Sequence, residues 1–155
     1  MAFPFTNEAQ CPCGASKFSL SKTPTRRFIC HCTICQKVYQ KPFADVTVMS
    51  AARVAVDTPH TIEFGKYKDG PALDRGICKE CNNPVVGFLP VMPFVRLAFV
   101  PCTNILDQET LPDPAMHIYY DSRVADIDDP LPKIEGDKKS QRKATGLVLA
   151  GFLGI

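Results

Sequence analysis

The sequence of 155 residues contains no tryptophan and three histidines, and its formal net charge is +2. So small a charge argues against a nucleic-acid partner, because basic binding domains carry a larger and clustered excess of lysine and arginine. No apolar run approaches the length of a membrane span, and the first eight residues lack the basic and apolar regions of a secretory signal. We therefore expect a cytoplasmic protein that does not enter a membrane.

Internal repeats and low-complexity tracts are also absent, and hydrophobic residues make up 45% of the chain, which is ordinary for a globular protein. The length suits one domain, which we assign to residues 1–136. Residues 137–155 form a tail that is first basic and then apolar. We expect its apolar part to dock on the domain or on a second subunit of a homodimer.

Strand-like stretches outnumber helix-like ones. Short segments rich in β-branched or aromatic residues predict strands at 16–20, 26–29, 43–49, 53–56, 61–64, 85–89, 95–100 and 116–120. Many of the fourteen prolines lie in the second half and disfavour long helices there, because proline removes a backbone donor. Only residues 33–39 and the C-terminal tail are predicted to be helical. The sequence thus predicts a mainly β domain with few short helices.

Cysteine is abundant, and seven of the eight cysteines fall into short clusters. The clusters are Cys11 with Cys13, then Cys30 with Cys32 and Cys35, and then Cys78 with Cys81. In a reducing compartment such tight spacings indicate metal thiolates rather than disulfides. A disulfide framework stays open as an alternative for a chain secreted by an unrecognised route.

The outer pairs, Cys11 with Cys13 and Cys78 with Cys81, are natural partners in one site. Zinc prefers a tetrahedral set of thiolates, and two tight turns that each supply two sulfurs make a closed structural site. Gly14 follows the first pair and Asn82 the second, and both tolerate the left-handed backbone of a zinc-binding knuckle. The alternative is two unrelated pairs of buried cysteines.

The middle cluster packs Cys30, Cys32 and Cys35 into six residues. Three ligands leave a tetrahedral zinc with an open position, which is typical of a catalytic site. The candidates for a fourth ligand that would close the site are His31, His60, His117 and Cys102. We expect His31 to point elsewhere because it lies between two ligands, and Cys102 is the main rival to an open position.

The motifs in order are Cys11-x-Cys13-Gly14, Cys30-His31-Cys32-x-x-Cys35-Gln36-Lys37, Cys78-x-x-Cys81 and His117-Ile118-Tyr119-Tyr120-Asp121-Ser122-Arg123. From about Gln10 to Glu135 the chain resembles the glutathione-dependent formaldehyde-activating enzyme family, which includes centromere protein V and has an Mss4-like β fold. The resemblance implies two zinc ions per chain, a structural one on the outer pairs and a catalytic one on the middle three cysteines. The chain departs from the family in having Asn82 where glycine is common, and in lacking tryptophan.

The resemblance also implies a carbon–sulfur lyase activity. The substrates would be a small-molecule thiol such as glutathione and a carbonyl compound such as formaldehyde, which combine to S-hydroxymethylglutathione. A zinc held by three thiolates favours sulfur as its fourth ligand, which suits this chemistry. Candidate proton donors are His31, Tyr39 and His117, and candidate partners for a glutathione carboxylate are Arg26, Arg27 and Lys37.

Two other functions remain open on the sequence alone. The first is a protein-binding module in which both zinc ions are structural. The second is a methionine sulfoxide reductase of related fold with one zinc and Cys102 as nucleophile, which requires a low thiol pKa. Metal stoichiometry and coordination distinguish the three hypotheses.

Overall fold

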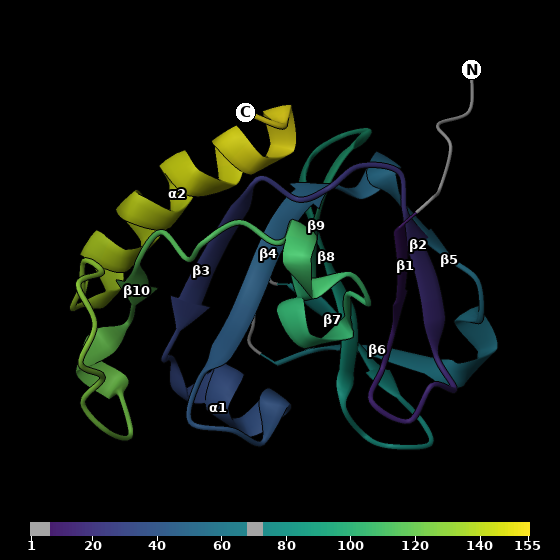
Figure 1. Ribbon diagram of the computed structural model, residues 1–155, viewed down its shortest axis with the longest axis horizontal. Helices are drawn as coiled ribbons and strands as arrows, with labels where there is room; N and C mark the ends of the chain where they lie inside the picture. The colour runs from purple at the N-terminus through teal and green to yellow at the C-terminus, as the bar shows by residue number, and fades with distance from the viewer. Residues whose placement is uncertain (1–6, 68–72) are drawn as a thin grey trace.

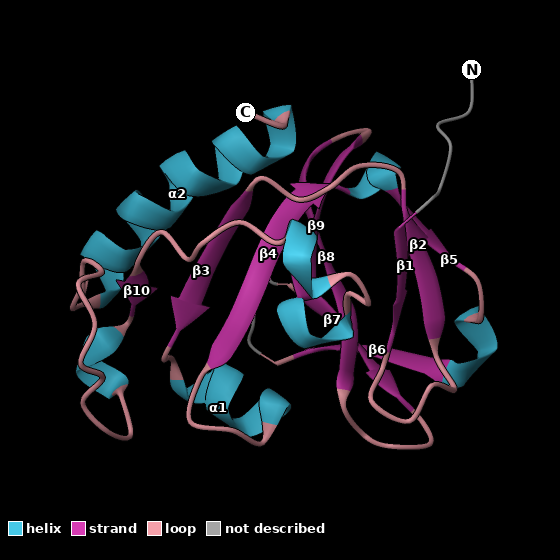
Figure 2. Ribbon diagram, in the orientation of Figure 1, coloured by secondary structure: helices cyan, strands magenta, loops and turns pink. Residues whose placement is uncertain are grey.

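The computed structural model describes residues 7–67 and 73–155, so Met1–Thr6, on which the expected lack of a secretory signal partly depends, lie outside the described residues. The strands are β1 Asn7–Gln10, β2 Lys17–Leu20, β3 Arg26–Cys30, β4 Ala44–Ser50, β5 Val54–Val56, β6 Ile62–Lys66, β7 Asp74–Cys78, β8 Pro84–Met92, β9 Val95–Pro101 and β10 His117–Ile118. The α-helices are α1 Thr33–Tyr39 and α2 Asp137–Leu153. Figure 2 shows strands through the middle of the molecule, α2 along one edge and α1 at the lower end, with short helical turns between strands.

Two sheets form the molecule (Figure 1). The smaller has the order β1-β2-β5, and the larger has the order β10-β3-β4-β9-β8-β7-β6. Strand β10 is the one parallel neighbour in the larger sheet among the described strands, and it pairs Ile118 with Cys30. This pairing places the His117 motif directly beside the first cysteine of the middle cluster.

The buried side chains gather in two clusters. The first lies around the small sheet and β8, with Phe18, Leu20 and Val85 fully buried. The second surrounds β3 and β4 and includes Phe28 and Val46. Cysteines of the outer pairs belong to the first cluster, and cysteines of the middle group belong to the second.

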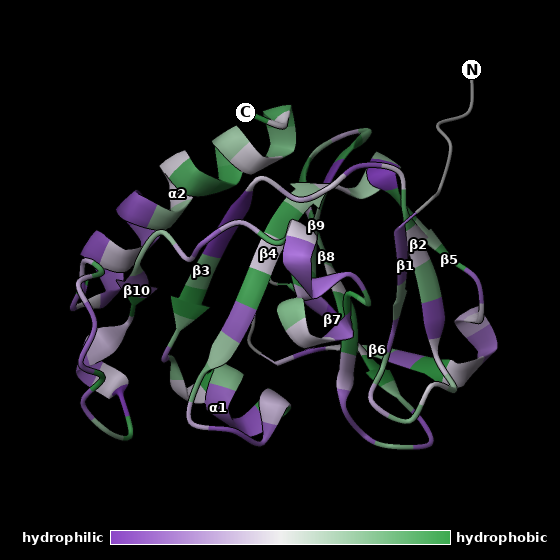
Figure 3. Ribbon diagram, in the orientation of Figure 1, coloured by the Kyte–Doolittle hydropathy of each residue, from purple (hydrophilic) through white to green (hydrophobic). Residues whose placement is uncertain are grey.

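Helix α2 packs on strand β4 along one side of the larger sheet (Figure 1). Figure 3 shows that the helix is hydrophilic in its first half and more hydrophobic in its second. Leu147 is buried in the second core cluster, and a Cβ at Gly151 would lie 2.6 Å from the backbone oxygen of Val48. The tail therefore docks on the domain through a close approach of helix backbone to strand backbone.

The expectation of a mainly β fold with few helices is confirmed. Each predicted strand overlaps an observed one, although the segment 116–120 is a two-residue strand followed by a 3-10 turn at Tyr120–Ser122. The sequence missed β1 and β7, because the polar sequence of β1 and the charged start of β7 do not show the alternation that marks a strand. Neither described helix has the length and apolar character needed to cross a membrane.

Candidate metal centres and the adjoining cavity

The four-cysteine group consists of Cys11, Cys13, Cys78 and Cys81, whose sulfur atoms all lie within 4.8 Å of one another. The backbone N–H of Ser16 donates to the Cys11 sulfur at 3.3 Å. Gly14 has a φ of 79° and Asn82 a φ of 60°, so both turns use the left-handed backbone expected of them. Four sulfurs at this spacing match the ligand number and type of a closed zinc site, so the residues present fit the metal.

The three-cysteine group consists of Cys30, Cys32 and Cys35, whose sulfurs also lie within 4.8 Å of one another. Cys30 ends β3, Cys32 caps the start of α1, and Cys35 lies in its first turn. The backbone N–H of Cys35 donates to the Cys32 sulfur at 3.3 Å. One loop and one helix start therefore assemble the whole group, as the spacing predicts.

The ionisation of each thiol in the three-cysteine group depends on its contacts with the other two. Hydrogen bonds with Cys30 and Cys35 lower the pKa of Cys32 far below its ordinary value, and the same contacts with burial raise the pKa of Cys30. Further ionisation would place like charges side by side, which is unfavourable without a cation. A zinc ion offsets that repulsion, so this donor set also fits the metal.

No fourth ligand joins the three-cysteine group in the described part of the chain. Cys102 is buried in the 3-10 turn Cys102–Asn104 and belongs to neither cysteine group. Burial and the neighbouring Asp45 raise the pKa of the Cys102 thiol. A nucleophilic cysteine needs a lowered thiol pKa, so this environment argues against Cys102 as the nucleophile of a reductase.

His31 points away from the cysteines that flank it. Its Nε2 lies 2.8 Å from Nδ1 of His117, and Nε2 of His117 lies 2.7 Å from a carboxylate oxygen of Asp129. Burial, with the neighbouring His117 as the second cause, lowers the pKa of His31 to about 4. Because the carboxylate accepts, His117 donates to Asp129 and accepts from His31 when both rings are neutral. The two rings thus form a buried chain that leads away from the sulfurs.

Gln36 joins the loop of the three-cysteine group to the segment that follows β10. Its amide nitrogen donates to the backbone oxygens of His31 and Ser122, both at 2.8 Å. The backbone N–H of His31 donates to the Ile118 oxygen at 3.0 Å. The segment after β10 therefore fixes the loop that carries Cys30 and Cys32.

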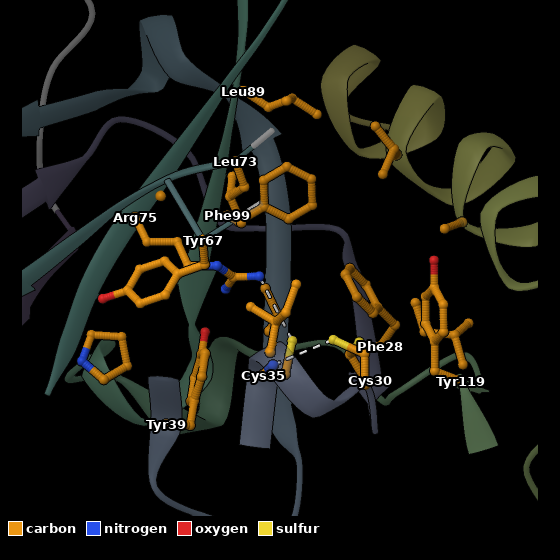
Figure 4. A pocket seen from close by; sticks show the side chains of 18 of the residues that line it. Phe28, Cys30, Cys35, Tyr39, Tyr67, Leu73, Arg75, Leu89, Phe99 and Tyr119 are labelled. Atoms are coloured by element: carbon orange, nitrogen blue, oxygen red, sulfur yellow. Dashed lines mark hydrogen bonds between the residues drawn. The ribbon is translucent and has the colours of Figure 1, made fainter. Parts of the chain in front are cut away.

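A cavity of about 770 Å³ adjoins the three-cysteine group, whose members line it. Figure 4 shows Cys30 and Cys35 at the lower edge of the cavity, with the guanidinium of Arg75 directed toward Cys35. The Arg75 Nη2 atom lies 3.9 Å from the Cys35 sulfur. Tyr39 also lines the cavity, and burial raises the pKa of its phenol above the ordinary value.

The sequence did not single out Arg75. The basic residues it proposed lie elsewhere, since neither Arg26, Arg27 nor Lys37 lines the cavity. Arg27 is instead paired with Asp45, with contacts of 2.6 and 2.8 Å. Of the proposed proton donors, Tyr39 lines the cavity whereas His31 and His117 do not.

A known protein family matches most of the chain, including both cysteine groups. The family described as "Glutathione-dependent formaldehyde-activating enzyme" matches residues 6–122, which is more than half of the chain. The chain belongs to this family. The recognition from sequence is thereby confirmed, as is the expected Mss4-like β fold. A search of curated proteins gave no match.

A solved structure shares the fold. The crystal structure of a Rhodobacter sphaeroides protein resembles this chain with a TM-score of 0.52 and 14% identity, over 64% of this chain and 88% of that one. At this identity the likeness concerns the fold alone. Helix α2 lies beyond the residues that match the glutathione-dependent formaldehyde-activating enzyme family.

Proposed function

We propose that this protein is a carbon–sulfur lyase that depends on zinc and forms or cleaves the adduct of a small thiol, such as glutathione, with a carbonyl compound, such as formaldehyde. The observation that supports the proposal is the contrast between the two cysteine groups. One has four sulfurs, and the other has three and adjoins a cavity. Three protein ligands and an adjoining cavity are what a catalytic metal requires.

In this proposal Cys11, Cys13, Cys78 and Cys81 hold a structural zinc ion. Cys30, Cys32 and Cys35 hold a catalytic one. When bound there, zinc would supply a coordination position that lowers the pKa of a substrate thiol. The free thiols of both groups suit a reducing, cytoplasmic compartment, where such groups are not lost to disulfides.

The proposed bond change is simple. The thiolate sulfur attacks the carbonyl carbon, a carbon–sulfur bond forms, and the carbonyl π electrons move to oxygen. A proton then converts the alkoxide to a hydroxyl, and cleavage is the reverse. The guanidinium of Arg75 is a fixed positive charge near the sulfurs and stabilises the negative oxygen. Tyr39 lines the same cavity, and a phenol is protonated near neutral pH, so Tyr39 can supply this proton.

The two histidines have a supporting role in this proposal. His31 and His117 contact each other rather than the cavity, and His31 lies between two ligand cysteines. They therefore orient the loop of Cys30 and Cys32 instead of transferring the proton. This assigns proton transfer to Tyr39 among the three candidates proposed from sequence.

The test is Cys32→Ser assayed with thiol–aldehyde adducts, together with metal analysis. We expect two zinc ions in the wild type, one in the variant, and loss of turnover in the variant. Cys102→Ser is the matched control, because Cys102 is a buried thiol outside both groups, and it should keep two zinc ions and wild-type turnover. Unchanged turnover of every adduct by Cys32→Ser would contradict the catalytic role of the three-cysteine group. A reactive Cys102 in a protein with one zinc ion would instead favour the methionine sulfoxide reductase.

A further inference from the structure

The cavity is much larger than formaldehyde requires. Its volume of about 770 Å³ lies in the range of pockets that enclose whole drug-sized ligands. Formaldehyde has two heavy atoms, so most of this space is left to other parts of the adduct. The nature of the lining then shows which kind of chemical group fits the remaining space.

The floor of the cavity is an apolar face of the larger sheet. Phe28, Val46, Val86, Leu97 and Phe99 contribute to it from four neighbouring strands. These side chains give no hydrogen bonds to a polar guest. A guest gains affinity from them only by removing its own apolar surface from water.

Charged groups are scarce around this space. Among the described residues that line the cavity, Arg75 carries the one basic side chain and Asp137 the one carboxylate. Glutathione carries two carboxylates and an ammonium group, and burying unpaired charges is costly. The apolar floor is therefore unsuited to the charged arms of the thiol and suited to the carbonyl half of the adduct.

Helix α2 completes the cavity on the side opposite Arg75 and Tyr67 (Figure 4). Ala144 and Val148 present apolar side chains to it, and Gln141 lines its polar end. This helix lies outside residues 6–122, which match the glutathione-dependent formaldehyde-activating enzyme family. The wall is therefore a feature of this chain beyond the part that carries the family motifs.

We propose that the carbonyl half of the preferred adduct is a large apolar aldehyde, aliphatic or aryl, and that helix α2 is the wall that selects it. The inference builds on the proposed function, since it names the substrate class of the same site. The aldehyde carbon lies at the cysteine end, and its apolar group extends over Phe28 and Phe99 toward Val148. Each buried methylene strengthens binding about fourfold, so a six-carbon aldehyde is distinguished strongly from formaldehyde.

Turnover of glutathione adducts with hexanal and with formaldehyde tests the preference in the zinc-loaded protein. We expect kcat/KM for the hexanal adduct to exceed that for the formaldehyde adduct at least tenfold. Val148→Trp and Ala144→Trp fill the space beside the wall, so each should lower this ratio at least tenfold. Leu149→Trp is the matched control, because Leu149 is 59% exposed and does not line the cavity. It should leave the ratio unchanged.

Binding gives a readout that needs no turnover. Calorimetry should show S-hexylglutathione binding at least tenfold tighter than S-methylglutathione, with the difference reduced in Val148→Trp and Ala144→Trp. Thermal melts identify a variant that fails to fold, and the second tryptophan variant then carries the test. Equal binding of the two probes, together with turnover of both adducts at one rate, would overturn this inference and leave the proposed function standing. A binding preference without turnover of either adduct would overturn the proposed function, and with it the assignment of the apolar group to an aldehyde substrate.

Discussion

The two cysteine groups differ in how far along the chain their members lie. Cys13 and Cys78, 65 positions apart, lie with their sulfurs 3.8 Å from each other. Cys30, Cys32 and Cys35 come from a single loop and helix start. A metal on the first group would close a long chain loop, whereas a metal on the second would close a short one. The first arrangement suits stability, and the second leaves the fold less dependent on the metal.

The two cysteine groups also differ in what surrounds them. The sulfurs of the four-cysteine group face one another at a pair of turns, with Cys11 and Cys78 buried in the first core cluster. The three-cysteine group adjoins a cavity with a guanidinium and a phenol nearby. Ligand number and neighbouring groups are the grounds on which we propose a structural role for the first group and a catalytic role for the second.

The largest expected effect is on folding. Cys78→Ser removes one of four ligands from the group that joins distant strands. Structural zinc sites contribute on the order of 10 kcal/mol in small domains, which is comparable to the whole stability of a protein of this size. We expect unfolded or aggregated protein with less than one zinc ion per chain, measured by circular dichroism, thermal melting and metal analysis.

Cys32→Ser is the matched substitution in the other group. It removes one sulfur by the same chemical change, but its group spans a single short segment. We expect a folded variant whose melting temperature stays far closer to the wild type than that of Cys78→Ser. Equal destabilisation by the two substitutions would contradict the division into a structural and a catalytic group.

Metal removal separates the groups without mutation. A chelator should remove the zinc bound by three sulfurs before the zinc bound by four, because fewer protein ligands hold it. Turnover should then fall to background while the far-ultraviolet circular dichroism stays unchanged, and added zinc should restore turnover. Simultaneous loss of both ions with the fold would show that the two sites are energetically alike.

Arg75→Met tests the electrostatic part of the comparison. If the guanidinium stabilises the developing negative oxygen, its loss lowers turnover about a hundredfold, as for other groups that stabilise an oxyanion. Lys37→Met is the matched control, because Lys37 is exposed on α1 near the same cysteines and does not line the cavity. Equal turnover by the two variants would remove Arg75 from the proposed reaction.

Each short cysteine cluster could be predicted from sequence because its information is local, whereas the joining of Cys13 to Cys78 across 65 positions was expected from the preference of zinc for four thiolates. A C-x-C or C-x-x-C turn fixes the distance between its own sulfurs, and Gly14 and Asn82 reveal the backbone of each turn. Helix α1 was predicted with its bounds for a similar reason, since its cysteines, its N-cap and its short length lie in consecutive residues.

The cavity could not be predicted in this way. Arg75 lies beside Cys35 because β7 pairs with β8 in one register, with an irregularity between Gly76 and Ile77. A shift of one residue would turn its side chain to the other face of the sheet. The contribution of Ala144 and Val148 depends likewise on how α2 docks, which the apolar and glycine-interrupted tail does not specify.

The smallest expected effect is on the free energy of unfolding and concerns the docking of α2. Two glycines of this helix, Gly151 and Gly146, allow a comparison. At Gly151 an added methyl group would lie 2.6 Å from the Val48 oxygen, so Gly151→Ala should lower the free energy of unfolding by about 1–3 kcal/mol. At Gly146 nothing lies within 4 Å of an added Cβ, so Gly146→Ala should raise it by about 0.5–1 kcal/mol through helix propensity. Thermal and urea melts measure both changes.

Because α2 borders the cavity of the three-cysteine group and not the four-cysteine group, Gly151→Ala should also weaken S-hexylglutathione binding while both zinc ions stay bound. Loss of zinc in this variant would mean that the helix supports the metal sites themselves, and the two regions would then be less independent than their geometry indicates.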